Sequence, residues 1–423
     1  MRLTVVLLSS LLAAPVVAQS IAMPTAHTGV TAALDLIKRD NTWTLEQQVS
    51  ICEIPAPPFK EQVRAADVVR RFQSLGLSNV RIDSEGNVLG ERKGSGTGPT
   101  VVLSGHLDTV FPEGTDVKVK REGTMFRSPG IGDDCRGLAT ILAVARALNE
   151  TKLPVPGKIL FVATVGEEGP GNLRGVRALF KNPPERIDYF ISVDGTGLGL
   201  TTGAVGSHRY LVQFQGPGGH SYGAFGMPNP IHALGRAIAK ISDFQVPASP
   251  RTTFNVGIVT GGTSVNTISP LGAMEIDLRS ESPEELAAVD AKLKAAVQHA
   301  LDEENARAPQ SPDKVTVKWI DMGVRPAVLV NDASVIARTA LAAGSVLGFV
   351  PRTGASSTDA NFPMSLGIPS ITLDGGGIGR GAHSIAESYD DGPDGWKGPQ
   401  WALLTSVVLA GLNGPAGAPR PIP

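Results

Sequence analysis

The sequence predicts an α/β fold: a main domain with a mostly parallel sheet flanked by helices, plus an inserted ferredoxin-like α+β domain. Three observations lead to this prediction. Short apolar runs alternate with amphipathic helical segments, and several of these runs end in Asp, Glu or His. Between about residues 203 and 319 this alternation gives way to a different order of strands and helices. A chain of 423 residues is also long enough for two domains.

Four apolar runs have the composition of strands that are buried on both faces of a sheet. Each is short and is followed at once by polar residues. In an open parallel sheet the binding site lies at the carboxyl ends of the strands, so these polar residues are candidates for one shared site. The runs are 100–104, 158–164, 188–193 and 370–373.

The segments between these runs predict helices. Residues 32–49 and 61–75 are amphipathic, and the apolar segment 138–148 follows the acidic pair Asp133 and Asp134 directly. Asp is a common N-cap residue, so helix capping alone is an alternative explanation for this pair. Residues 80–83 and 87–90 read as two strands around a turn.

The inserted region predicts two β-α-β units, which is the pattern of a ferredoxin-like domain. Its expected strands are 208–215, 253–259, 273–280 and 314–320, and its expected helices are 229–241 and 283–300. We therefore expect the main domain in two parts, 19–203 and 318–423, with the inserted domain at 204–317.

Charge and the N-terminal segment limit the class of protein. The formal net charge is −2, which gives no indication of binding to nucleic acid or to an anionic membrane. Arg2, the apolar run 3–12 and the small residues 15–18 form a signal-peptide pattern with cleavage after Ala18. No later apolar stretch is long enough to span a bilayer. We expect a periplasmic or secreted protein.

The chain has two cysteines, Cys52 and Cys135. An oxidising compartment permits a disulfide between them, and the alternative is two buried free thiols. Two cysteines alone do not make a disulfide framework.

Five potential metal ligands occur at or just beyond predicted strand ends. They are His106, Asp133, Glu168, Asp194 and His383. A mixed set of imidazole and carboxylate donors suits two zinc ions about 3.5–4 Å apart that share one carboxylate. Each ligand taken alone has an ordinary structural explanation, but their common position at the strand ends favours a metal site.

Two further acids have positions that suit supporting roles. In extended backbone the side chains of His106 and Asp108 point the same way, so Asp108 can accept a hydrogen bond from the far ring nitrogen of His106. Glu167 precedes Glu168, and a carboxylate beside a metal site is what a general base requires. Chance occurrence of each pair is the alternative.

These motifs, in this order along the chain, resemble the dinuclear-zinc amidohydrolases of metallopeptidase clan MH. The family includes tripeptide aminopeptidase, carnosinase, aminoacylase, succinyl-diaminopimelate desuccinylase and carboxypeptidase G. The resemblance covers nearly all of the chain after the signal peptide. Its motifs are Gly105–Pro112, Gly130–Asp134, Glu167–Glu168, Asp194 and Gly381–Ser384.

The resemblance implies a role for each ligand. His106 and Asp194 would hold one zinc, Glu168 and His383 the other, and Asp133 would bridge them. Cobalt or manganese are possible substitutes for zinc. Asp108 would orient His106, and Glu167 would be the general base for hydrolysis of an amide bond.

The inserted domain resembles the family's lid and dimerisation domain. His220 lies in a motif whose histidine stabilises the oxyanion, often in the partner subunit, which implies a homodimer. Asn266 and Arg279 resemble residues that grip the substrate's carboxylate or backbone. For His220 the alternative is a loop histidine, and for Arg279 it is an ion pair at a strand edge.

Two departures from the family pattern concern substrate preference. Cys135-Arg136-Gly137 stands where many members have Lys-Gly-Gly. The ligand at 194 is Asp, which is more typical of members that act near a free amino terminus, whereas deacylases more often have Glu. This difference favours a peptidase for di- or tripeptides, with an N-acyl amino acid deacylase as the alternative.

Two other interpretations agree less well with the sequence. The segment 219–223 fits the nucleophile-elbow pattern of serine hydrolases, but one glycine and two prolines make 224–230 a loop where an elbow requires a helix. A binding protein that has lost catalysis should lack several ligands, and none of the five is missing here.

Overall fold

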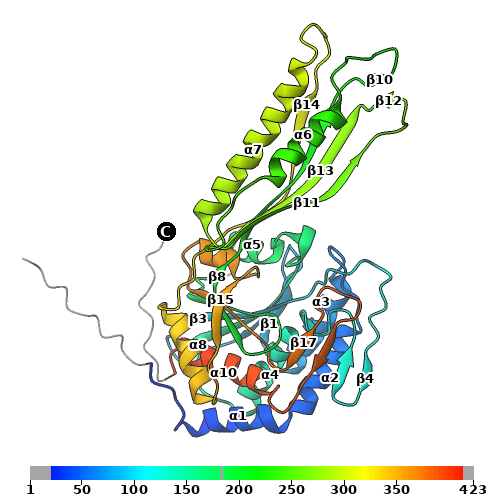
Figure 1. The fold of residues 1–423 in the computed structure, drawn as a ribbon. Helices are drawn as coiled ribbons and strands as arrows, with labels where there is room; N and C mark the ends of the chain where they lie inside the picture. Colours follow the sequence, from blue (N-terminus) through cyan, green and yellow to red (C-terminus); the bar gives the residue numbers. More distant parts are fainter. Residues whose placement is uncertain (1–20, 182, 184, 413–423) are drawn as a thin grey trace, which may run out of the picture.

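The computed structural model describes residues 21–181, 183 and 185–412. The predicted signal peptide therefore lies outside the described residues. The chain forms two domains, a broad α/β domain and an elongated smaller domain that projects from it (Figure 1). No helix in the described ranges combines the length and the apolar character needed to cross a bilayer.

The α/β domain is built on an eight-stranded sheet in the order β1-β2-β6-β3-β7-β16-β8-β15. Its centre is parallel, because β6, β3, β7 and β16 pair side by side in the same direction. The strands β2 and β8 run antiparallel to their central neighbours, β6 and β16, so the predicted mostly parallel sheet is confirmed. The bounds are β1 Ser78–Ile82, β2 Val88–Arg92, β3 Thr100–His106, β6 Lys158–Thr164, β7 Tyr189–Val193, β8 Gly199–Ala204, β15 Arg352–Ser356 and β16 Ser370–Leu373.

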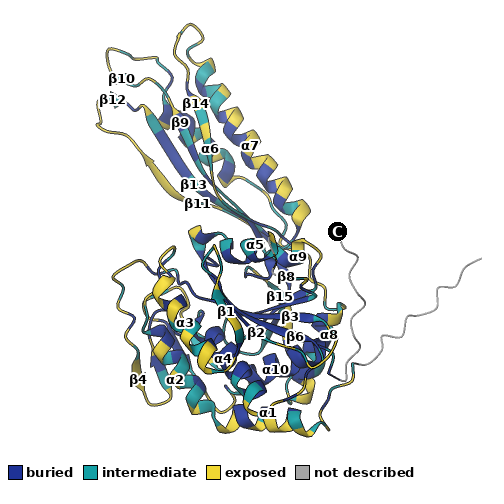
Figure 2. Cartoon of the chain, turned by 180° about the vertical axis from the view of Figure 1, so that it is seen from behind, coloured by how far each residue is buried: buried dark blue, intermediate teal, exposed yellow. Residues whose placement is uncertain are grey.

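Helices cover both faces of this sheet, as Figures 1 and 2 show. The larger core lies on one face and includes the fully buried Trp401. A smaller core on the other face lies beneath α5 and α9. Helices of the first layer are α1 Thr28–Arg39, α2 Asn41–Cys52, α3 Gln62–Ser74, α4 Cys135–Glu150, α8 Val335–Val346 and α10 Lys397–Leu409; those of the second are α5 Arg174–Lys181 and α9 Asn361–Ser365.

The smaller domain has the βαββαβ order and the strand order β14-β9-β13-β11 of a ferredoxin-like fold, as predicted. Two helices pack on its antiparallel sheet and enclose a core of its own. A short β10–β12 pair lies at its far end in both views (Figures 1 and 2). The bounds are β9 Gly206–Gln215, β10 Gly219–His220, α6 Pro230–Ser242, β11 Thr252–Gly261, β12 Thr267–Ile268, β13 Leu271–Ser280, α7 Pro283–Ala306 and β14 Thr316–Arg325.

Some boundaries differ from the sequence-based ones. The helix expected at 32–49 is two helices, because the backbone leaves the helical conformation at Asp40 between α1 and α2. The boundary expected after residue 317 falls inside β14, which continues to Arg325. A small antiparallel sheet was not predicted; it consists of β4 Lys120–Glu122, β5 Met125–Arg127, β17 Ile378–Arg380 and β18 Ser388–Asp390.

The two cysteines are not joined. Cys52 at the end of α2 and Cys135 at the start of α4 are both buried free thiols. The Cys52 Sγ lies 3.5 Å from the carbonyl oxygen of Pro129. Of the two alternatives left open by the sequence, the structure has the thiol pair.

Candidate metal centre

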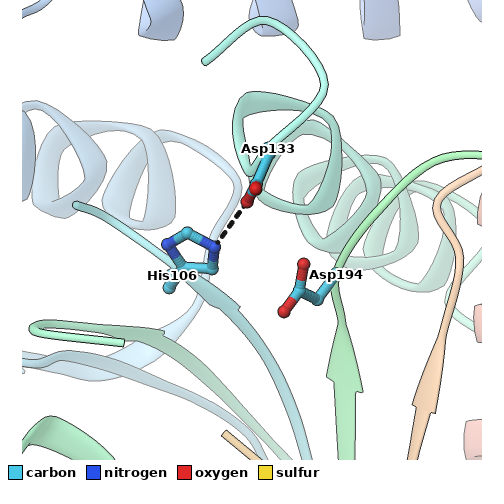
Figure 3. Close-up of side chains that lie close together, drawn as sticks. All are labelled: His106, Asp133 and Asp194. Atoms are coloured by element: carbon cyan, nitrogen blue, oxygen red, sulfur yellow. Dashed lines mark hydrogen bonds and ion pairs between the residues drawn. The ribbon is translucent and has the colours of Figure 1, made fainter. Parts of the chain in front are cut away.

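The carboxyl ends of the central strands bring the predicted ligands together. His106 is the last residue of β3, Glu168 follows β6, and Asp194 follows β7. Asp133 lies in the glycine loop before α4, and His383 lies in the loop after β17. Figure 3 shows the side chains of His106, Asp133 and Asp194 pointing toward one another.

Asp133 belongs to two groups of potential ligands at once. One group is His106, Asp133 and Asp194, and the other is Asp133, Glu168 and His383, each with donor atoms within 4.8 Å of one another. The Asp133 Oδ1 lies 3.0 Å from His106 Nε2, and its Oδ2 lies 3.0 Å from His383 Nε2. His383 Nε2 is also 2.9 Å from Glu168 Oε1. The geometry is that of two adjacent cation sites that share one carboxylate.

The donor set and its burial fit a pair of divalent cations. His106 and Glu168 are buried, and Asp133 and Asp194 are half-buried. Burial raises the pKa of Asp194 well above its ordinary value, and the nearby charge of Asp133 adds to this shift. Hydrogen bonds to Asp133 and Glu168 raise the pKa of His383 to about 10. Such crowding of acids away from water is unfavourable unless cations compensate it.

The two aspartates of the glycine loop have separate roles. Asp134 caps α4, since its Oδ1 accepts the Gly137 N–H at 3.0 Å and its Oδ2 accepts the His106 N–H at 2.8 Å. Capping therefore accounts for Asp134, while the neighbouring Asp133 faces the ligands. The peptide bond between them is cis.

Asp108 supports the site differently from the sequence-based expectation. The His106 Nδ1 is 3.0 Å from the backbone oxygen of Asp108 but 3.6 Å from its carboxylate. The carboxylate instead accepts the backbone N–H groups of Glu167 and Glu168, at 3.0 and 2.8 Å. Asp108 thus fixes the ring through its main chain and the two glutamates through its side chain.

Glu387 is a supporting residue that was not predicted from the sequence. It is buried, and its carboxylate accepts backbone N–H groups from Gly130, Gly132 and Asp133 at 2.8–3.0 Å. It therefore holds the loop that presents Asp133. The signal that could have found it is an acid four residues after His383.

Glu167 lies beside the ligands and is held by an arginine. Its Oε1 is 2.9 Å from Nη1 of Arg325, and the side chains of both residues are 5% exposed. Arg325 also donates to the backbone oxygen of Glu167 and, at 3.0 Å, to the Ser357 hydroxyl. Arg325 ends the last strand of the small domain, and no local sequence pattern indicates this contact with a residue far away in the chain.

A cavity of about 620 Å³ opens over the ligands and is lined by both domains. Arg279 of the small domain lines it, together with Arg209, which was not predicted from the sequence. Asp277 lies between them, 2.9 Å from Arg209 Nε and 2.7 Å from Arg279 Nε. These contacts occupy one edge of each guanidinium group, and the remaining N–H groups can bind a carboxylate.

His220 and Asn266 are not part of this cavity. Both are exposed, and they lie together, since the Ser221 N–H donates to the Asn266 backbone oxygen at 3.0 Å. His220 belongs to β10, at the far end of the small domain (Figure 1). The structure of one chain therefore leaves these two residues apart from the metal ligands.

The fold and the ligand set define a two-domain metallohydrolase. The family model described as Peptidase family M20/M25/M40 matches residues 102–397, and the chain belongs to this family. Its enzymes are peptidases and amidohydrolases, which confirms the resemblance seen in the sequence.

Similar sequences extend over much of the chain. A Bacillus subtilis protein, uncharacterized protein YqjE, is 26% identical over 351 residues, or 78% of this chain and 89% of that protein. The succinyl-diaminopimelate desuccinylase of Corynebacterium glutamicum is 24% identical over 260 residues, or 60% of this chain and 68% of the enzyme.

Solved structures share the fold at low sequence identity. Aminopeptidase PepT from Bacillus cereus has a TM-score of 0.69 at 22% identity, covering 86% of this chain and 96% of that one. Human carnosine dipeptidase 1 has a TM-score of 0.68 at 14% identity, covering 90% and 100%. The Bacillus subtilis protein YXEP, a dinuclear metal-binding peptidase, has a TM-score of 0.64 at 18% identity, covering 88% and 99%.

Proposed function

We propose that this enzyme is a zinc-dependent peptidase that hydrolyses the amide bond of di- or tripeptides. The observation that carries the proposal is Asp133, which is shared by two ligand groups, with the carboxylate of Glu167 beside them. When bound, a pair of zinc ions supplies Lewis-acid polarisation of the amide carbonyl and lowers the pKa of water. Cobalt or manganese are candidate substitutes.

The chain's own residues account for the remaining steps. In our proposal His106 and Asp194 would hold one cation, Glu168 and His383 would hold the other, and Asp133 would contribute to both. Glu167 removes a proton from the attacking water as its oxygen adds to the carbonyl carbon. The same carboxyl then returns the proton to the nitrogen of the leaving amine as the C–N bond breaks.

The two arginines of the small domain support a substrate with a carboxylate. Arg209 and Arg279 line the cavity with part of each guanidinium group free, so a peptide's carboxyl terminus can be held there. A carboxylate is equally present in an N-acyl amino acid. A deacylase is therefore the second candidate, and the relative named as a desuccinylase favours testing it.

Chelation with metal add-back tests the proposed function. We expect a chelator to abolish hydrolysis of small peptides, and zinc or cobalt to restore it. Comparing di- and tripeptides with N-acetyl amino acids separates the two candidates. Hydrolysis that persists in the chelator would rule out the metal mechanism.

Replacing the proposed base tests the role of Glu167. We expect Glu167→Gln to retain metal and lose about 10²- to 10⁴-fold in kcat, the range typical of general base catalysis. Glu46→Gln on the exposed face of α2 is the matched control. Metal content by elemental analysis separates a lost base from a lost site.

We further propose that the enzyme is exported and dimeric. The signal-peptide pattern at 1–18 supports export, and fractionation of expressing bacteria with a cytoplasmic marker tests it. Exposed apolar side chains on the small domain support a homodimer, including Tyr222, Phe225 and Val265 at 90%, 89% and 103% relative exposure. Contact with a second copy would cover them.

A further inference from the structure

One carboxyl group on the cavity wall has no role in the mechanism above. Asp374 directly follows β16 and lines the same cavity as the metal ligands. Its Oδ2 accepts the Gly199 N–H at 2.7 Å, whereas its Oδ1 accepts no hydrogen bond from any described residue. Around it the cavity wall carries the hydroxyl residues Thr201, Thr358 and Thr372.

The chain makes room for this carboxyl group. The segment 194–199 wraps around Asp374, with backbone hydrogen bonds from residues 374, 375 and 376 to the oxygens of Gly199, Gly195 and Gly197. A Cβ atom added at Gly197 or Gly199 would lie 2.9 or 2.8 Å from the Asp374 Oδ2. Larger residues in this segment would displace the carboxyl group, so the glycines preserve its position.

Among the described residues, Asp374 is the ionisable group of the cavity wall that neither forms an ion pair nor serves as a proposed metal ligand or base. Arg209 and Arg279 contact Asp277, and Glu167 contacts Arg325. The other acids of the lining are proposed metal ligands. No ion pair joins Asp374 to any described residue, although Arg352, on the exposed start of β15, contributes a weak attraction.

We propose that Asp374 is a specificity-determining residue that binds a primary ammonium group of the substrate. The group would be a free amino terminus or a lysine side chain. This inference rests on the proposed function and narrows its substrate class. A partly buried carboxylate forms a strong charge-assisted hydrogen bond with an ammonium group, and acylation of the amine removes that charge. Asp374 would therefore select free peptides over N-acylated ones.

The test compares Asp374→Asn with wild type on matched substrates. One pair is trialanine and N-acetyl-trialanine, and the other replaces one alanine with lysine or with norleucine. Asn keeps an oxygen for the Gly199 N–H and removes the charge. In each pair we divide kcat/KM for the substrate with the ammonium group by kcat/KM for its uncharged counterpart. We expect this ratio to fall about 10- to 100-fold in the variant, the range for a lost charged hydrogen bond. Asp35→Asn, on the exposed face of α1, is the matched control.

The two pairs separate the sources of the ammonium group. Loss of preference in the acetylation pair assigns Asp374 to the amino terminus, and loss in the lysine pair assigns it to a side chain. An equal fall of kcat/KM on all substrates, with the ratios unchanged, would show that Asp374 only supports the 194–199 segment and would overturn the inference.

Binding measurements keep this inference distinct from the proposed function. Calorimetry on metal-loaded Glu167→Gln, with and without Asp374→Asn, measures the affinity for trialanine and N-acetyl-trialanine without turnover. Tighter binding of trialanine than of N-acetyl-trialanine that disappears in Asp374→Asn supports the inference, even if the wild-type enzyme hydrolyses no peptide. Absence of hydrolysis would refute only the proposed peptidase activity. If each protein binds trialanine and N-acetyl-trialanine equally well, and binds the lysine and norleucine peptides equally well, the inference about Asp374 is refuted. The proposed peptidase activity is not affected by that result.

Discussion

A buried carboxylate that accepts several backbone N–H groups can shape a metal site without touching the metal. Glu387 accepts three such groups from the loop that ends in Asp133. Burial raises the pKa of Glu387 to about 7, although these hydrogen bonds act in the opposite direction. The position of the shared aspartate therefore depends on a residue more than 250 positions away in sequence.

We predict that Glu387→Gln weakens metal binding by about 10- to 100-fold, the usual effect of removing a group that orients a ligand. Gln offers one oxygen, and its NH₂ group would face backbone N–H donors. Competition with a chromogenic chelator measures the affinity, with Glu46→Gln as the control. Unchanged affinity in a protein of unchanged melting temperature would contradict the role of Glu387.

Asp374 gives a prediction for stability against pH. Burial raises the pKa of Asp374 to about 7 from an ordinary 3.8. Because the folded pKa is the higher one, this group's contribution to stability is full below about pH 4 and is lost as the pH rises toward 7. The side chain of Asn does not titrate in this range, so Asp374→Asn should not lose this stability as the pH rises.

We expect the melting temperature of Asp374→Asn, measured relative to that of wild type, to rise by a few °C as the pH goes from 4 to 7. Calorimetry at matched metal content over this pH range measures it, and Asp35→Asn should show no such trend. A constant difference would show that the pKa of Asp374 is the same in the folded and unfolded protein.

At the scale of secondary structure, β14 links the two domains through one ion pair. It belongs to the sheet of the small domain, and its last residue, Arg325, contacts Glu167 at the metal centre. The pair is almost fully buried. Removing one member of such a pair leaves a charge without a partner in a region of low dielectric.

We predict that Arg325→Met lowers the free energy of unfolding by about 3–5 kcal/mol, the typical effect of breaking a buried ion pair. Adding Glu167→Gln should recover part of the loss. Urea denaturation of the metal-free proteins measures both. The control is Arg70→Met, because the exposed Arg70 side chain pairs with Asp67 at the surface of α3 and its loss should change stability by less than about 1 kcal/mol. If Arg325→Met lowered the free energy of unfolding no more than Arg70→Met does, the prediction would be wrong.

The sequence predicted the elements whose signals are local. Apolar runs predicted the central strands, and the polar residue at each strand end predicted candidate ligands, because parallel strands end at one edge. Arg325 and Glu387 gave no such signal, since each acts on a loop distant in sequence. The split between α1 and α2 was missed because no proline or glycine marks the break at Asp40.

Within one chain, two residues that the family resemblance places at the substrate, His220 and Asn266, lie outside the cavity over the metal ligands. The small domain extends away from the metal centre and carries β10 and β12 at its far end (Figures 1 and 2). His220 and Asn266 lie there, beside the exposed Tyr222 and Val265. A second copy that covers this end would bring the two polar residues toward the partner's cavity. The apolar surface and the displaced His220 thus have one explanation in a homodimer.

Subunit complementation tests this arrangement. We expect His220→Ala and Glu167→Gln each to be nearly inactive alone. If His220 acts on the partner's site, a mixed dimer has one complete site, formed by the catalytic domain of the first variant and the small domain of the second. Random exchange makes half of the dimers mixed, so mixing equal amounts should restore about a quarter of wild-type activity. The control mixes labelled and unlabelled subunits of His220→Ala alone, which should stay nearly inactive. The label shows that subunits have exchanged. Exchange without recovered activity would place His220 outside the partner's site.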